Sequence, residues 1–158
     1  MIAERESGNY ALLKYTEPNG DRRLVVSYVI EETASQDVYR AFTDPDAAAR
    51  WCDVTSPGDG AGLTLLLPEA PGALSLVRAR PMDQLEFAVA HPGGEPSTVI
   101  FSIAPAERQT VLVASHRHLP VEHEQVWSAF WCGPMFLRLG DLLRRGGAAA
   151  RPTIVQVR

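Results

Sequence analysis

Three histidines in the second half of the chain come closest, by type and spacing, to a metal site. His116 and His118 alternate along a β-prone run, so a strand would place them on one face, and His123 follows after a short loop. No cysteine or carboxylate stands at a compelling ligand spacing, and Glu122 and Glu124 are typical of a helix start. We therefore expect structural or exposed histidines and no bound metal.

Nucleophilic catalysis would need a serine or cysteine beside a histidine and an orienting acid. The chain has no Gly-x-Ser-x-Gly motif, and its two cysteines, Cys52 and Cys132, form no Cys-x-x-Cys pair. A dyad of Cys132 and His116 is conceivable, but buried free cysteines usually behave as small hydrophobic side chains. The glycines of residues 58–62 precede no lysine-bearing helix, as a phosphate-binding loop would require. We expect reduced thiols, no catalytic residue and no cofactor.

The composition excludes several classes of partner. The chain has 158 residues, a length typical of one domain, so we expect a single domain over residues 1–158 that ends in a tail over residues 147–158. The net charge is -4 and Lys14 is the only lysine, which argues against nucleic acid. No apolar run is long enough to insert into a membrane, and the charged N-terminus lacks a signal core, so we expect a cytoplasmic protein.

The elements that would position these side chains are mostly strands. Residues 10–16 and 24–31 are β-prone runs on either side of a Pro-Asn-Gly turn. In the second run, alternation predicts that Leu24, Val26, Tyr28 and Ile30 face inward. Further apolar runs follow at residues 63–67, 73–80, 84–90, 98–103 and 109–118, divided by Pro- and Gly-rich linkers. This spacing predicts an antiparallel meander with one buried face.

Helical segments interrupt and close this series of strands. Residues 36–42 should form a short helix that ends before Pro45, and Pro45 should begin a second helix capped by Asp44. Residues 121–145 form an amphipathic segment in which Gly133-Pro134 predicts a break near Cys132. Its overlapping apolar stripes contain Val126, Phe130, Leu137, Trp127, Trp131, Met135 and Leu142.

Residues 38–51, with the sequence VYRAFTDPDAAARW, carry a family resemblance. Together with the Leu-x-Phe strand around Phe87 and the Ser115-His116 step, they resemble the SRPBCC or START-like superfamily of Bet v 1 type, over residues 10–146. Within it, the chain is similar to bacterial proteins of the activator of Hsp90 ATPase homologue 1-like group. Gly133-Pro134 in the closing helix and Cys52-Asp53 after Trp51 depart from the family pattern.

The resemblance implies an α+β helix-grip fold. In that fold a curved antiparallel sheet of about six or seven strands surrounds a long C-terminal helix, and two short helices follow the first strand. Members bind lipids, sterols, polyketides and other apolar molecules, and some are cyclases or hydrolases.

We therefore expect a small hydrophobic ligand to bind, without catalysis, in a cavity between sheet and helix. The expected ligand-binding residues are Tyr28, Trp51, Phe87, Phe101, His116, Trp127, Phe130 and Trp131. Arg78 and Arg80 should either face solvent or mark a polar end of this cavity.

Three other functions stay open at this point. The chain could be a polyketide cyclase or aromatase that moves protons through a pocket His or Arg, a self-resistance protein that sequesters a natural product, or a partner of an Hsp90-type chaperone. A homodimer could form through the β-prone residues 154–157 at a sheet edge.

Overall fold

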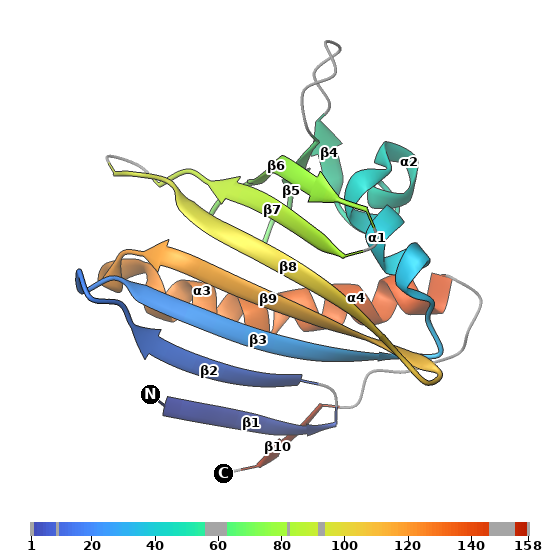
Figure 1. Ribbon diagram of the computed structural model, residues 1–158, viewed down its shortest axis with the longest axis horizontal. Helices are drawn as coiled ribbons and strands as arrows, with labels where there is room; N and C mark the ends of the chain where they lie inside the picture. The colour runs from blue at the N-terminus through green and yellow to red at the C-terminus, as the bar shows by residue number, and fades with distance from the viewer. Residues whose placement is uncertain are drawn as a thin grey trace.

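The computed structural model describes residues 2–8, 10–55, 63–81, 83–91, 94–145 and 154–157. Its strands form one antiparallel sheet of ten strands in the order β10-β1-β2-β3-β9-β8-β7-β6-β5-β4. Helices α3 and α4 run across one face of this sheet, and α1 and α2 lie at its β4 end (Figure 1). This arrangement confirms the predicted α+β helix-grip fold.

The elements have the following bounds. The strands are β1 (Ile2–Gly8), β2 (Tyr10–Thr16), β3 (Arg22–Glu31), β4 (Asp53–Thr55), β5 (Thr64–Leu66), β6 (Leu74–Arg80), β7 (Gln84–Val89), β8 (Ser97–Ala106), β9 (Gln109–Leu119) and β10 (Ile154–Val157). The helices are α1 (Ser35–Thr43), α2 (Pro45–Ala48), the short 3-10 helix η1 (Val121–His123), α3 (Glu124–Cys132) and α4 (Pro134–Arg145).

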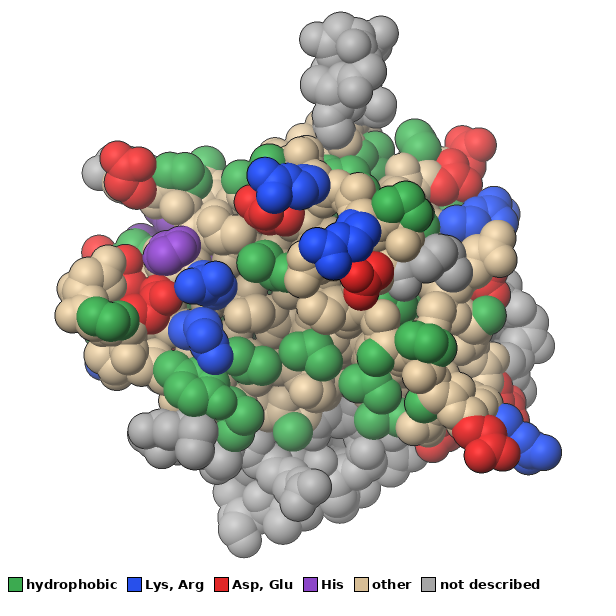
Figure 2. All heavy atoms as spheres, viewed as in Figure 1, with side chains coloured by type: hydrophobic (Ala, Val, Ile, Leu, Met, Phe, Trp, Pro, Cys, Tyr) green, Lys and Arg blue, Asp and Glu red, His purple; other side chains and the backbone are tan. Residues whose placement is uncertain are grey.

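The inner face of the sheet follows the two-residue period of the sequence. In β3 the side chains of Leu24, Val26, Tyr28 and Ile30 are buried, as predicted, and the residues between them are partly exposed. The same alternation buries one face of β7 and β8. On the outer face, hydrophobic side chains are mixed with charged ones (Figure 2).

The two short helices follow from the Asp44-Pro45 break. The Asp44 side chain accepts a hydrogen bond from the Asp46 amide, and Pro45 occupies the first turn of α2, as expected. Helix α1 buries Val38, Ala41 and Phe42. This placement brings the Phe42 ring to the inner face of the sheet, where it packs on Phe101.

The C-terminal helical segment is divided at Gly133, as the Gly-Pro pair predicted. Trp127, Phe130, Trp131 and Met135 are buried. Two residues of the expected apolar stripes are not: Val126 is 51% exposed and Leu137 is 48% exposed. A helix that lies on a sheet buries only one side, and these positions fall on the other side. No helix among the described residues has the length and apolar character needed to cross a membrane.

Two details differ from the sequence-based expectations. The sheet has more strands than the expected six or seven, because β1 and β10 extend one edge and the short β4 and β5 extend the other. Strand β10 pairs with β1 of the same chain, whereas residues 147–153 of the predicted tail lie outside the described residues.

A β-bulge decides where the arginines of β6 point. Leu76 pairs with Phe87 but Arg78 pairs with Glu86, so Val77 is the additional residue on β6. A bulge shifts the alternation by one residue, which places Arg78 and Arg80 on the solvent side instead of the face that Leu76 shares. Both arginines are exposed, the first of the two alternatives considered.

Candidate functional site

A network of aromatic side chains fills the space between the sheet and α3. The network, called the aromatic cluster below, consists of Tyr28, Phe42, Trp51, Phe87, Phe101, His116, Trp127, Phe130, Trp131 and Phe136. All of these side chains are at most 5% exposed. The structure therefore brings every expected ligand-binding residue into one connected group.

A chain of buried hydrogen bonds runs into this cluster. The Trp131 indole Nε1 lies 3.2 Å from His116 Nδ1, His116 Nε2 lies 2.8 Å from Ser97 Oγ, and Ser97 Oγ lies 2.6 Å from His91 Nε2. The His91 ring then stacks on the His123 ring, with 4.9 Å between the ring centroids. The chain thus connects the interior at Trp131 to the surface at His123, which is partly exposed.

The direction of each hydrogen bond in the chain follows from the indole group. An indole nitrogen can only donate, so Nδ1 of His116 accepts and the proton of the neutral ring lies on Nε2. That Nε2–H donates to Ser97 Oγ, whose own hydroxyl hydrogen is then free to donate to Nε2 of His91. The His91 proton consequently lies on Nδ1. The geometry therefore selects one tautomer for each of these two rings.

Burial keeps His116 neutral. Its side chain is 0% exposed, and desolvation lowers its pKa to about 3, with a smaller contribution from nearby His91. Desolvation also lowers the pKa of His91, and the neighbouring His123 acts in the same direction, whereas Glu122 raises it. At neutral pH these hydrogen-bonded side chains therefore place no charge in the apolar interior.

Most polar rings of the aromatic cluster have a hydrogen-bond partner inside the protein. The Tyr28 hydroxyl donates to the Trp131 carbonyl at 2.5 Å, and Trp51 Nε1 donates to the Ala41 carbonyl at 2.7 Å. Trp127 is the exception, because its Nε1 is buried and has no partner. A buried donor without an acceptor is rare in folded proteins.

A separate surface pocket of about 370 Å³ lies beside the end of α2. Its lining residues are Ala49, Arg50, Trp51, Cys52, Asp53, Pro68 and Arg138. Arg138 binds both carboxylate oxygens of Glu69, at 2.7 and 3.0 Å, and also donates to the Trp51 carbonyl. The hydrogen bond from Arg138 lowers the pKa of Glu69. Trp51 thus lines this pocket while its ring packs edge-to-face with Phe42 of the aromatic cluster.

The cysteines show no sign of nucleophilic activation. Burial raises the pKa of the Cys52 thiol to about 12, and the thiol hydrogen bonds to the Ala48 carbonyl at 3.4 Å. Cys132 is partly exposed at the end of α3. Ser97 and Trp131 engage both ring nitrogens of His116, so that ring has no nitrogen left to activate Cys132. The conceivable dyad of Cys132 and His116 is therefore not formed.

The three histidines considered as a metal site do not meet. His116 is buried in the aromatic cluster, His123 stacks on His91, and His118 is exposed at a corner of the sheet. A β-bulge separates the faces of His116 and His118, because β9 has two residues between His116 and Leu119 where β3 has only Arg23. His118 adopts a φ of 60° there and points away from the inner face.

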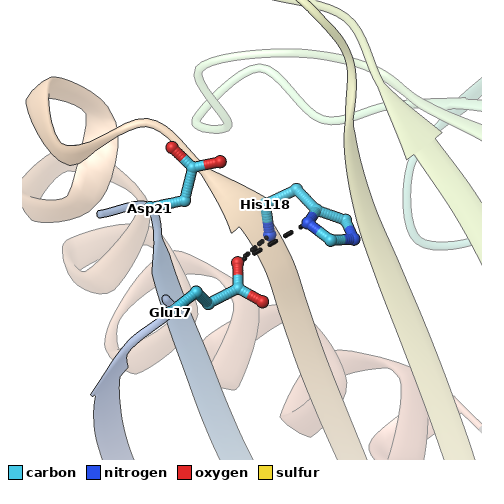
Figure 3. A group of neighbouring side chains, drawn as sticks. All are labelled: Glu17, Asp21 and His118. Atoms are coloured by element: carbon cyan, nitrogen blue, oxygen red, sulfur yellow. Dashed lines mark hydrogen bonds and ion pairs between the residues drawn. The ribbon is translucent and has the colours of Figure 1, made fainter. Parts of the chain in front are cut away.

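His118 instead lies beside Glu17 and Asp21 (Figure 3). The His118 amide donates to Glu17 Oε1 at 2.8 Å, and the ligand-type atoms of the three side chains lie within 4.8 Å of one another. Asp21 already accepts a hydrogen bond from the Asn19 side chain at 3.0 Å. The Glu17 carboxylate thus holds the end of β9 to the turn between β2 and β3 through the His118 amide and ring.

Sequence reasoning identified His116 but missed Ser97 and His91. Both continue an alternation that was visible: Ser97 precedes Val99 and Phe101 on one face of β8, and His91 follows Phe87 and Val89 beyond β7. A two-residue period therefore points both side chains inward. Pairing of β8 with β9 then sets Val99 opposite His116, which brings Ser97 within reach of the imidazole.

Comparison with solved structures supports the fold. CalU16 from Micromonospora echinospora shares 20% identity, with a TM-score of 0.58 over 89% of this chain and 72% of that one. DynU16, described as a putative protein in the dynemicin biosynthetic locus, shares 21% identity, with a TM-score of 0.57 over 86% of this chain and 50% of that one. The Aha1 dimer from Colwellia psychrerythraea shares 18% identity, with a TM-score of 0.59 over 77% of this chain and 97% of that one.

No curated protein matches the sequence at a significant level. A family model does match: the one described as activator of Hsp90 ATPase homolog 1-like protein covers residues 32–131. The matched region contains α1, α2, the strands β4 to β9 and α3 up to Trp131, and with them the aromatic cluster except Tyr28 and Phe136. The chain therefore belongs to the family of activator of Hsp90 ATPase homolog 1-like proteins.

Proposed function

We propose that this protein binds a small hydrophobic molecule, of the lipid, polyketide or aromatic metabolite class, between its sheet and α3 without transforming it. The observation that carries the proposal is the aromatic cluster itself, a connected group of ten buried rings on the inner side of the sheet. Ligand sites are typically apolar with a few convergent polar groups. Large aromatic rings bring much apolar contact area with few polar atoms, which suits a flat or lipid-like ligand.

The rings of the aromatic cluster contact one another, so a ligand has to displace side chains as it enters. The break at Gly133 gives α3 the means to move. Helix α3 has nine residues, and Pro134 at the start of α4 has no backbone N–H, so one helical hydrogen bond is missing at the junction and the two helices can bend there. Movement of α3 away from β9 would separate Trp127 from His116, whose ring centroids are 4.7 Å apart.

One solved structure of the same fold is compatible with this proposal. DynU16 is described as a putative protein in the dynemicin biosynthetic locus. A self-resistance or sequestering role would be a special case of the same binding.

A screen of hydrophobic metabolites by thermal shift and native mass spectrometry tests the proposal. We expect a subset of planar or lipid-like compounds to raise the melting temperature and to appear as a complex of one ligand per chain. Phe130→Leu, in the aromatic cluster, should change the affinity of those hits, whereas Val126→Ala, on the exposed side of the same helix, should not. The proposal fails if no compound binds, or if both variants bind every hit as the wild type does.

A cyclase or aromatase activity is the second candidate, because a titratable ring, His116, lies within the interior. Its low pKa makes the neutral ring a base of little strength and leaves no imidazolium to act as an acid at neutral pH. Turnover of a polyketide-like substrate by the wild type, lost in His116→Ala with binding retained, would replace the non-catalytic proposal with this one.

The remaining predictions concern partners and location. Binding to an Hsp90-type chaperone would be detected by a pull-down with the purified chaperone, and a homodimer by sedimentation of the purified chain. The Colwellia relative is described as a dimer, which makes the second experiment worthwhile. A cytoplasmic location would be checked by fractionation of cells that express the full chain.

A further inference from the structure

Trp127 carries a hydrogen-bond donor that the folded chain leaves unused. The side chain is 0% exposed, and its Nε1–H has no acceptor. A buried N–H that has lost its water and gained no partner destabilises the folded state, so proteins tolerate it where something outside the chain supplies the acceptor. Trp127 thus differs from Trp51 and Trp131, whose indole nitrogens bond to Ala41 and His116.

The other polar rings of the aromatic cluster offer a ligand little. Nε2–H of His116 is directed at Ser97 and its Nδ1 lone pair is occupied by Trp131. The Tyr28 hydroxyl hydrogen is committed to the Trp131 carbonyl. A molecule that enters the aromatic cluster therefore meets an open donor at Trp127 but no ring nitrogen with an open lone pair.

The unused N–H lies at the border of the aromatic cluster. A Cβ atom built on Gly72 would be 3.7 Å from Trp127 Cζ2, and Cζ2 neighbours the ring carbon that bears Nε1. The N–H edge of the indole consequently lies near the Gly72 backbone, in the turn between β5 and β6. Pro71, the residue before this glycine, is exposed, so this turn reaches the surface of the protein.

We propose that Trp127 Nε1–H anchors the ligand by donating to an oxygen acceptor on it, and that the ligand is a planar apolar ketone or quinone. A carbonyl oxygen accepts a hydrogen bond without bringing a donor that needs its own partner. A hydroxyl group would bring such a donor into a cluster in which Trp131 already occupies Nδ1 of His116. This inference rests on the proposed function and makes it more specific.

Two compounds of almost the same shape provide the test. 9-Fluorenone carries a carbonyl where fluorene carries a methylene group. Equilibrium dialysis gives the dissociation constant of each, and their ratio cancels most of the shared apolar contribution. The ratio should favour fluorenone about tenfold more in the wild type than in Trp127→Phe, since one hydrogen bond to a buried donor is worth roughly that factor.

Val126→Ala is the control, because Val126 lies on the exposed side of the helix that carries Trp127 and is not part of the aromatic cluster. The fluorenone preference should survive in this control. A second measurement does not depend on the fold of the variants. The chain has three tryptophans, so the wild type gives three indole N–H signals by NMR, and fluorenone should shift the Trp127 signal much more than fluorene does.

The outcomes separate the inference from the function on which it rests. Both compounds could bind while the fluorenone preference is the same in the wild type and in Trp127→Phe, and while fluorene shifts the Trp127 signal as much as fluorenone does. In that case the anchoring role of Trp127 is wrong and ligand binding stands. If neither compound binds to the wild type, the proposed function fails for planar aromatic ligands, and the inference fails with it.

Discussion

The indole of Trp131, on α3, donates to Nδ1 of His116, on β9, across 3.2 Å. This single bond joins the helical layer to the sheet by polar contact and fixes which nitrogen of His116 carries the proton. Because the proton lies on Nε2, the same ring can donate to Ser97. The stability of the interior therefore depends on one neutral tautomer of one buried ring.

His116→Phe should lower the free energy of unfolding by about 2 kcal/mol, because it leaves the Trp131 N–H buried without an acceptor. Urea denaturation measures this loss. His118→Asn is the control: His118 is exposed, and asparagine tolerates the positive φ found there, so a change of less than about 0.5 kcal/mol is expected.

The double variant His116→Phe with Trp131→Phe sharpens this result. Removal of both polar partners leaves no orphaned donor, so the double variant should lose less than the sum of the two single variants. Additive losses would contradict the hydrogen bond between these two side chains.

Stability should fall as the pH is lowered from 7 to 5.5. The pKa of His116 is about 3 in the folded protein and near 6.5 when the chain is unfolded, so below pH 6.5 the unfolded state takes up protons that the folded state does not. The contribution of His116 to the free energy of unfolding is fully present above pH 6.5 and is lost progressively as the pH falls toward 3. We expect a loss of about 1 kcal/mol at pH 5.5 from His116, and the lowered pKa of His91 adds to it.

Urea unfolding at a series of pH values measures this slope. Most carboxylates remain ionised at pH 5.5, so they contribute little in this range. His116→Phe should flatten the profile between pH 7 and 5.5. A profile as steep as that of the wild type in this variant would show that His116 is not the group responsible.

The fold could be predicted from the sequence largely because its signals are local. The alternation of Leu24, Val26, Tyr28 and Ile30 needs only the two-residue period of a strand, and the break at Gly133-Pro134 needs only the missing amide hydrogen of proline. The eight expected ligand-binding residues came together for the same reason, since each is a large ring on an inward-facing position.

The face on which a side chain lies was predicted wrongly where one strand has an additional residue opposite its neighbouring strand. The alternation of β9 predicted one face for His116 and His118, and a strict two-residue period would likewise put Leu76 and Arg78 of β6 on one face. A β-bulge breaks the period in each case, and its position depends on the pairing of distant strands. The hydrogen bonds through Ser97 were missed because the register of β8 against β9 places Ser97 near His116. The sequence of neither strand alone determines this register.

Cys52 should be almost unreactive toward Ellman's reagent in the native protein at pH 8. With a pKa of about 12 its thiolate is a very small fraction of the population, so the reaction should be roughly a thousandfold slower than in the unfolded chain. The Cys132→Ala variant isolates this signal, and Cys52→Ala reports on the partly exposed Cys132 for comparison. Reaction of native Cys52 at the unfolded rate would contradict its burial.

The last prediction compares two buried tryptophans in the absence of ligand. Trp127→Phe and Trp51→Phe remove a similar volume from sites that are 0% and 5% exposed, so the packing loss should be similar. Trp51→Phe also removes a hydrogen bond to the Ala41 carbonyl, whereas Trp127→Phe removes a donor that has no partner. Trp127→Phe should therefore lower the free energy of unfolding by about 1 to 2 kcal/mol less than Trp51→Phe does. Urea denaturation of both variants decides the matter, because an equal or larger loss at Trp127 would mean that its N–H already has an acceptor in the free protein.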